Sequence, residues 1–273
     1  MGLVRIGPVI TSRSNPLIRD LRAVLRSPGR GAARLIVEGW RLLGAAAEAG
    51  VPIEIVLYTP AAAADPRWAS LRQQFPASGA REALVSPEVL AALSQVETAQ
   101  GVLGVVARPA PASPSILRTP DALLVVLDGI QDPGNVGAIL RTAAAAGATA
   151  AVTVAPAADP FTPKALRASA GAVWRLPLLH FGAASDAAAA VMRPGLRLFV
   201  ADPRGEKLHS QVSFARPVAL VFGSEGAGAD PAWLRAGAET VRLPIVGPVE
   251  SLNVAAAAAV LLYGAAGLFA PSP

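Results

Sequence analysis

The chain has 273 residues, of which 53% are hydrophobic and 16% are charged, and this balance excludes an intrinsically disordered protein. The absence of Cys excludes disulfides and thiolate metal sites, and the presence of only two His argues against a multi-His metal centre, so we expect no bound metal. The net charge of +5 is concentrated in residues 1–41, which contain eight Arg and only two acidic residues. This excess of positive charge favours a nucleic acid as partner over a merely solvated helix face.

The amino terminus has no sustained apolar run before a small-residue cleavage site, which argues against a signal peptide. The longest apolar run, residues 254–270, is rich in Ala and Gly. This composition and length predict a buried helix of an α/β protein rather than a membrane span. We therefore expect a cytoplasmic protein with no membrane partner.

Helices and strands alternate along the first part of the chain. Apolar residues at helical spacing predict a helix over residues 15–26, with Arg on its other faces. The further predicted strands lie at 34–39, 53–58, 82–85 and 101–107, and the further predicted helices at 41–49, 65–75 and 86–94. This order predicts a small α/β/α sandwich, which we take as a first domain over residues 1–107.

Residues 108–120 hold four prolines and cannot continue a helix or a central strand, so we expect a linker there. A second domain is expected over residues 121–273. Its predicted strands lie at 123–128, 148–154, 175–179, 196–202, 218–223 and 240–244, and its predicted helices at 135–147, 163–172, 183–192, 231–236 and from about 252. Apolar strands joined by helical crossovers predict a mostly parallel sheet covered on both faces, and hence the α/β class.

Three of these strands end in polar loops, and ligands of open parallel sheets bind beyond the carboxyl ends of the strands. Asn135 and Arg141 follow the first strand. Asn is a good N-cap, and Arg is the residue best suited to bidentate phosphate recognition. A helix cap and one solvated Arg explain the same residues without any function.

The second loop, residues 223–228, places three glycines around Glu225, and the third, residues 243–254, carries Ser251 and Asn253. Glycines allow a backbone to approach a ligand closely, although a tight turn explains them equally well. Ser and Asn before an Ala-rich run are also typical helix caps. The glycine spacing matches neither the dinucleotide-binding nor the P-loop fingerprint, which argues against a nucleotide-dependent oxidoreductase.

In this order and spacing, the three loops resemble a known family. The stretches PGNVGAILRTA (133–143), LVFGSEGAG (220–228) and LPIVGPVESLNVAAA (243–257) resemble the SpoU (TrmH-type) RNA 2′-O-ribose methyltransferases of the SPOUT superfamily. The stretch RASAGA (167–172) is similar to the same family. SRSNPLIRDLR, LIVEGWRLL, VLYTP and LSQVETAQGVLGVV, all within the first 106 residues, resemble the family's ribosomal-protein-like substrate-binding domain. The resemblance covers nearly the whole chain.

The resemblance implies that S-adenosylmethionine binds in a deep trefoil knot made by the carboxy-terminal loops, although knots are otherwise almost absent from proteins. By motif match, Gly223, Leu243, Ile245 and Leu252 are its expected contacts, with the apolar ones beside adenine. The resemblance also implies a homodimer whose interface lies at the knotted regions. Burial of the apolar last helix in that interface fits this expectation.

The reaction that the resemblance implies is transfer of a methyl group to a ribose 2′-hydroxyl, which needs neither a metal nor a cysteine. Arg141 matches the family's catalytic arginine. Because an arginine stays protonated, we expect it to grip the adjacent phosphate and stabilise the developing alkoxide. Asn135 and Glu225 are expected to orient Arg141 and the loops, and Ser251 and Asn253 to orient the ribose.

The first domain is expected to collect RNA, because it resembles that of rRNA-acting members and carries the Arg excess. Ribosomal RNA is therefore favoured over tRNA as the substrate. Methylation of a tRNA ribose, methylation of a base nitrogen and a non-catalytic RNA-binding relative remain as alternatives, the last disfavoured by the presence of the polar motif residues. The expected RNA-binding residues are Arg13, Arg19, Arg22 and Arg41.

Overall fold

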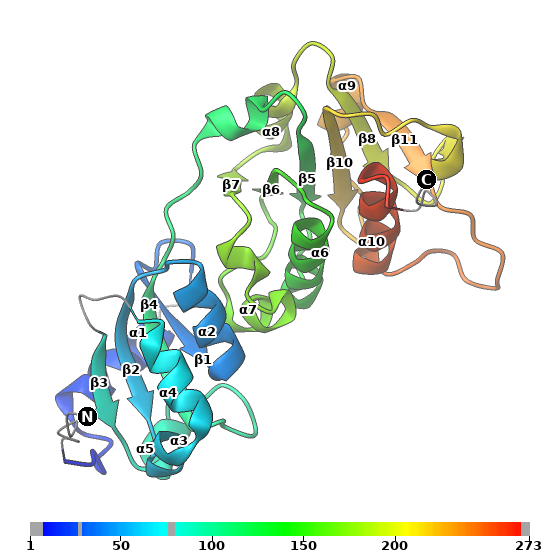
Figure 1. Ribbon diagram of the computed structural model, residues 1–273. Helices are drawn as coiled ribbons and strands as arrows, with labels where there is room; N and C mark the ends of the chain where they lie inside the picture. Colours follow the sequence, from blue (N-terminus) through cyan, green and yellow to red (C-terminus); the bar gives the residue numbers. More distant parts are fainter. Residues whose placement is uncertain (1–7, 27–28, 76–79, 269–273) are drawn as a thin grey trace. The chain divides into compact units, whose positions relative to one another are not determined.

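A computed structural model describes residues 8–26, 29–75 and 80–268, and contacts within the chain divide it into two units (Figure 1). The first unit comprises the residues up to Pro109 together with Phe161–Trp174, and the second comprises Ala110–Pro160 and the chain from Arg175 onward. Each unit has its own sheet and its own hydrophobic core, so each is a structural domain in its own right.

The sheet of the first unit is mixed. Its four strands lie in the order β1 (Arg34–Glu38), β4 (Val102–Ala107), β2 (Ile53–Tyr58) and β3 (Arg81–Leu84). β4 is antiparallel to both of its neighbours, whereas β2 and β3 are parallel. Each strand lies within one residue of a range predicted from its apolar pattern.

Helices cover both faces of this mixed sheet. On one face, α1 (Pro16–Arg26) and α5 (Pro87–Ala91) pack in one core with Leu103 and Val105 of β4. Gly104 alternates with those two residues and therefore points to the other face. The same core includes Ile18, Leu21, Val89 and Leu90 from the two helices.

The other face carries α2 (Trp40–Glu48), and Gly104 allows it to lie close to the sheet. A Cβ at Gly104 would lie 2.4 Å from Leu43 Cδ1, so a side chain at this position would have to displace that of Leu43. Two short helices, α3 (Pro60–Ala64) and α4 (Pro66–Gln73), follow β2, and α4 packs beside α2. α4 corresponds to the helix predicted over 65–75, whereas α3 lies outside every predicted helix. Each of the two helices begins with a side-chain cap followed by a proline, and the caps are Thr59 and Asp65.

A segment from the second half of the sequence also belongs to the first unit. It contains α7 (Pro163–Ser169) and the 3₁₀ helix η2 (Ala172–Trp174), which lie against β1 and α2. Between them Gly171 has a φ of 87°, and a Cβ there would lie 2.4 Å from Ala45 Cβ. The sequence placed this segment in the domain 121–273. Periodicity identifies a helix but does not show what the helix packs on, and the contacts assign it to the first unit.

The second unit contains a sheet of seven parallel strands, which confirms the parallel α/β sheet predicted from sequence. Because the strands are parallel, their carboxyl ends lie along one edge of the sheet. β9 was not predicted, since two residues are too few to show a pattern. The order is β7 (Leu178–Phe181), β6 (Ala150–Val154), β5 (Leu123–Asp128), β10 (Val218–Gly223), β8 (Arg197–Ala201), β11 (Glu239–Arg242) and β9 (Lys207–Leu208).

Most of the expected linker is folded against this second sheet. It forms the 3₁₀ helix η1 (Pro114–Arg118), whose Leu117 is fully buried in the core of the unit. The Ala112 N–H donates to the Leu178 carbonyl at 2.9 Å and ties the segment to β7. The chain therefore passes from one unit to the other at Pro109, near the start of the Pro-rich segment.

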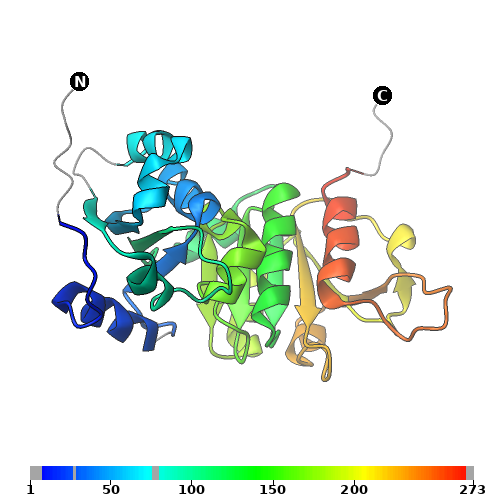
Figure 2. The ribbon, with the colours of Figure 1, turned by 90° about the horizontal axis from the view of Figure 1, so that it is seen from below.

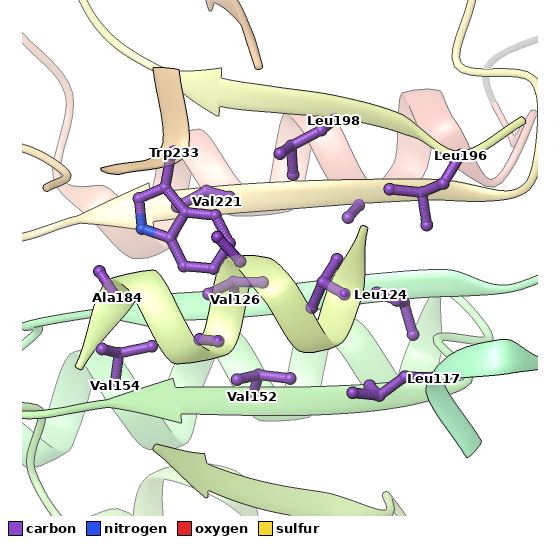
Figure 3. Packing of buried hydrophobic residues seen from close by; sticks show 14 of the residues in the cluster. Leu117, Leu124, Val126, Val152, Val154, Ala184, Leu196, Leu198, Val221 and Trp233 are labelled. Atoms are coloured by element: carbon purple, nitrogen blue, oxygen red, sulfur yellow. The ribbon is translucent and has the colours of Figure 1, made fainter. Parts of the chain in front are cut away.

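Helices cover both faces of the parallel sheet. α6 (Pro133–Ala145) and α10 (Val254–Ala265) pack side by side on one face (Figure 2). α8 (Ala184–Val191) and α9 (Ala232–Arg235) cover the other, where Trp233 is fully buried beside Val126 and Val221 (Figure 3). No helix in the described part of the chain is long and apolar enough to cross a membrane.

Candidate active site

Hydrogen bonds join one polar residue from each of the three motif loops. The Asn135 amide nitrogen donates to Glu225 Oε1 at 2.5 Å, and the Asn253 amide nitrogen donates to Asn135 Oδ1 at 3.1 Å. Asn135 lies in the first turn of α6, Glu225 in the loop after β10, and Asn253 at the start of α10. The structure therefore brings together three of the five residues predicted to be catalytic.

Helix capping divides the roles of the two asparagines. Asp132, and not Asn135, caps α6 by accepting a hydrogen bond from the Gly134 N–H. The capping interpretation of Asn135 is therefore wrong, and its amide is available to Glu225 and Asn253. Asn253 does cap α10, through its oxygen and the Ala255 N–H at 2.9 Å, while its nitrogen binds Asn135.

The glycine-rich loop after β10 is folded tightly back on the strand. A Cβ at Gly223 would lie 2.1 Å from the backbone nitrogen of Ala229, so the approach requires glycine. Ser224 and Gly228 exchange two backbone hydrogen bonds of 3.0 Å, which close the loop between them. The loop thus holds Glu225 at its tip.

A cleft of about 710 Å³ opens at the carboxyl ends of β8, β10 and β11. The loops that follow these strands line it, together with the first turns of α10. All four residues predicted to contact the cofactor are among the lining: Gly223, Leu243, Ile245 and Leu252. Glu225 and Ser251 line it as well, whereas Asn135, Asn253 and Arg141 do not.

Arg141 stands apart from this polar group. It lies in α6 nearly two turns after Asn135, and its exposed side chain makes no hydrogen bond or ion pair with any described residue. The expected orienting contact from Asn135 or Glu225 is not formed. A guanidinium in this position is free to meet an external anion.

The loop after β8 contributes charged residues that the sequence analysis missed. Asp202 and Arg204 line the cleft, and Asp202 accepts a hydrogen bond from the Arg204 N–H at 2.7 Å. They belong to none of the three motifs. The rule that ligands bind beyond strand ends would have found them, because Asp202 was predicted as the last residue of its strand.

The four predicted RNA-binding arginines do not form one surface. Arg13, Arg19 and Arg22 lie in or just before α1, on the face of the mixed sheet that α1 covers. Arg41 is exposed in α2, on the opposite face. Arg34 is held by Asp20 at 2.9 Å and by Glu54 at 3.0 Å, so it is occupied within the fold.

Comparison with known proteins gives the family. The model of the SpoU rRNA Methylase family matches residues 122–263, and that of an MRM3-like substrate binding domain matches residues 15–104. The chain is 34% identical, over 94% of its length and 92% of the relative's, to an uncharacterized tRNA/rRNA methyltransferase of Synechocystis. The chain belongs to the SpoU rRNA methylase family.

Further relatives support the same family and chemistry. The 23S rRNA (uridine(2479)-2′-O)-methyltransferase of Streptomyces viridochromogenes is 31% identical over 94% of this chain and 91% of its own length. The crystal structure of the SpoU methyltransferase AviRb from Streptomyces viridochromogenes, in complex with AdoMet, has a TM-score of 0.80 at 29% identity and covers 93% of this chain and 98% of that one. An AdoMet-bound rRNA methyltransferase from Sinorhizobium meliloti has a TM-score of 0.81 at 26% identity, covering 97% and 99%. This SpoU methylase is an S-adenosylmethionine-dependent RNA 2′-O-ribose methyltransferase.

The cleft of this SpoU methylase fits S-adenosylmethionine in size and chemistry. Its volume lies within the range of roughly 300–1,000 Å³ that small-molecule sites occupy. Leu243, Ile245 and Leu252 give part of the cleft an apolar wall. Among the described residues, no group of three or more His, Cys, Asp or Glu side chains could hold a metal. Four of the five charged residues that line the cleft are acidic, which suits the cationic sulfonium and ammonium groups of S-adenosylmethionine. The acidic residues are Asp202, Glu225, Asp230 and Glu250, and the basic one is Arg204.

Proposed function

We propose that this chain methylates the 2′-hydroxyl of a ribose in ribosomal RNA. The observation that carries the proposal is the hydrogen-bonded chain from Glu225 through Asn135 to Asn253, which joins three loops beside a cleft of the size that the cofactor needs. Similarity over 94% of this chain to a 23S rRNA 2′-O-methyltransferase supports the choice of substrate.

In this proposal the cleft is the cofactor site. Gly223 lets the backbone of the loop after β10 approach the cofactor, and Leu243, Ile245 and Leu252 enclose its adenine. Bound there, S-adenosylmethionine would supply a methyl group carried on a positively charged sulfur, and transfer of that methyl group to the ribose oxygen would leave a neutral thioether.

Arg141 acts on the RNA. Its exposed guanidinium binds the phosphate next to the target ribose through paired hydrogen bonds and so fixes the direction of the 2′-hydroxyl. It also stabilises the negative charge that develops on the oxygen as the hydroxyl loses its proton. Because an arginine stays protonated, the proton passes to water and not to Arg141.

The polar residues of the three loops hold this arrangement. Asn135 and Glu225 fix the loop after β10 against α6, the helix that carries Arg141. Asn253 fixes the start of α10 against the same helix. Ser251, which is exposed and lines the cleft, orients the ribose together with Asn253.

The region 1–107 collects the RNA and the region 121–273 carries out the transfer. The match of residues 15–104 to an MRM3-like substrate binding domain supports the first assignment. Arg19 and Arg22, which are three positions apart in α1, form the main phosphate-binding surface with Arg13 just before the helix, and Arg41 makes a separate contact. A ribosomal substrate also favours a cytoplasmic location.

The carboxy-terminal loops form a deep trefoil knot around the cofactor, and two chains form a homodimer at the knotted regions. Exposed apolar side chains beside the cleft support burial against a second chain, since Val246 is 98% exposed and Val249 56% exposed. Size-exclusion chromatography with light scattering measures the assembly. A monomer at micromolar concentration contradicts the dimer.

The test of function is to map 2′-O-methyl groups in total RNA from cells with and without this gene. The proposal expects one ribose methylation in ribosomal RNA to disappear with the gene and to return with the wild-type gene but not with the Arg141→Ala variant. Loss of a tRNA ribose methylation, or of a base methylation, overturns the proposed substrate.

A further inference from the structure

Asp128 is a buried carboxylate that the proposed mechanism does not use. It is the last residue of β5, and the residue is only 6% exposed. One oxygen, Oδ2, accepts two hydrogen bonds, from the Asp230 N–H at 2.6 Å and from the Trp233 indole N–H at 2.9 Å. No cationic side chain among the described residues is paired with it. Burial raises the pKa of Asp128, while the two hydrogen bonds work against that rise.

Both donors lie in the connection that follows β10. Asp230 is the last of nine consecutive residues, 222–230, that line the cleft. Trp233 follows in α9 and is fully buried in the core beneath the sheet (Figure 3). Asp128 therefore holds the point where the cleft loop ends and the anchored helix begins.

The beginning and the tip of the loop 222–230 are held by other contacts. Gly223 pairs with Asp128 itself in the β5–β10 register, and Ser224 and Gly228 close the tip by two backbone bonds. Glu225 then reaches Asn135 in α6. The end of the loop, at Asp230, is tied to the neighbouring strand β5 by Asp128. Both ends of the loop are therefore held at the carboxyl end of β5.

We infer that Asp128 is a positioning residue for the cofactor cleft: its carboxylate fixes the returning limb of the loop 222–230 and thereby sets the shape of the wall against which S-adenosylmethionine binds. The inference rests on the proposed assignment of the cleft. Asp128 does not line the cleft, so it acts only through the loop. Loss of the carboxylate raises the Kd and KM for the cofactor, whereas the affinity for RNA stays unchanged.

Two substitutions separate the hydrogen bonds from the charge. Asp128→Ala removes the acceptor of both hydrogen bonds and is expected to weaken cofactor binding about tenfold, the equivalent of one charge-assisted hydrogen bond. Asp128→Asn keeps an oxygen able to accept both bonds and is expected to restore most of the affinity. Trp233→Phe removes one donor and leaves the Asp230 bond, so its effect on the cofactor Kd should be intermediate.

The experiment measures the Kd for S-adenosylmethionine by calorimetry, the Kd for an rRNA fragment and the Tm of the full-length protein. Thr153→Val is the matched control, because Thr153 is fully buried in the adjacent strand β6 and donates to the Leu179 carbonyl, away from the cleft. This control is expected to lower the Tm without changing the cofactor Kd. Indole fluorescence adds a readout, since the emission of Trp233 should shift in Asp128→Ala and return towards wild type in Asp128→Asn.

Wild-type cofactor affinity in Asp128→Ala overturns the inference, as does an equal loss of affinity in Thr153→Val. If Asp128→Ala does not fold, wild-type affinity in Trp233→Phe overturns it instead. Leu252→Asp, in the exposed wall of the cleft, separates this inference from the proposed function. Unchanged cofactor binding in Leu252→Asp contradicts the assignment of the cleft, whereas loss there without loss in Asp128→Ala contradicts only the role of Asp128.

Discussion

The side chains of Asn135 and Asn253 are joined by a hydrogen bond of 3.1 Å, although 118 positions separate them in the chain. Each asparagine uses both ends of its amide. Asn253 caps α10 with its oxygen and binds Asn135 with its nitrogen, and Asn135 accepts from Asn253 while it donates to Glu225. Exchanging the oxygen and nitrogen positions of either side-chain amide would lose the hydrogen bond that each atom makes. Asparagine is therefore required at both positions, and a residue of similar shape does not replace it.

Asn253 allows its two roles to be separated. Asn253→Ala should lower the free energy of unfolding by about 1 kcal/mol through loss of the cap, and should also reduce kcat. Asn253→Asp keeps a cap but cannot donate to Asn135, so it should retain wild-type stability and still lose activity. Chemical denaturation and steady-state kinetics measure the two effects. Full activity in Asn253→Asp contradicts a role for the bond to Asn135.

Arg141 should matter for turnover and not for stability. Because its side chain is exposed and makes no bond with a described residue, Arg141→Ala should change the free energy of unfolding by less than about 0.5 kcal/mol. Loss of charge stabilisation in the transition state should lower kcat by about 10²–10³-fold, with an unchanged Kd for the cofactor. Arg141→Lys keeps the charge but not the paired geometry and should recover only part of kcat. Near-normal turnover in Arg141→Ala refutes the assignment.

Asp128 gives a pH dependence of stability with a defined sign. Burial raises its pKa in the folded protein above the ordinary value of 3.8. Between these two values the folded state binds more protons than the unfolded state, so the free energy of unfolding falls as the pH rises through that window. Asp128→Asn lacks this titration and should gain Tm relative to the wild type over the same window. Parallel Tm curves for the two proteins from pH 3 to pH 7 exclude a raised pKa.

The arginines of α1 should determine how RNA binding depends on salt. Each phosphate contact contributes roughly 0.7–0.9 to the slope of log K against log salt concentration. The double variant Arg19→Ala/Arg22→Ala should therefore reduce the slope by up to about 1.8. Arg34→Met is the control, because Asp20 and Glu54 already hold Arg34 and its loss should leave the slope unchanged. Equal slopes for the double variant and the wild type place the RNA elsewhere.

The strands and the parallel sheet could be predicted because their signal is local. β5 (Leu123–Asp128) is a continuous buried run, and its predicted and observed limits coincide. The packing of Phe161–Trp174 on the first unit could not be predicted, since the fit of Gly171 against Ala45 depends on contacts far apart in sequence. The strand β9 could not be predicted either, because its two residues are too few to show an apolar pattern.

The residues of the site could also be predicted in part, whereas the contacts between them could not. The motifs identified Asn135, Glu225 and Asn253, but only the fold shows that they touch one another. The cap of α6 was misassigned because Asp132 and Asn135 are both good capping residues, and local preference alone does not choose between them. Asp128 was read as the end of a strand, and its role depends on two donors more than 100 positions away.

Ribose methylation is tested most directly by incubating the purified protein with S-adenosylmethionine labelled in its methyl group and with ribosomal RNA from cells that lack the gene. Digestion to nucleosides then locates the label. We expect it in a single 2′-O-methylnucleoside, to be lost when the target nucleotide carries a 2′-deoxyribose, and to be absent with Arg141→Ala. Label on a base nitrogen, or label in tRNA and not in ribosomal RNA, contradicts the proposed reaction.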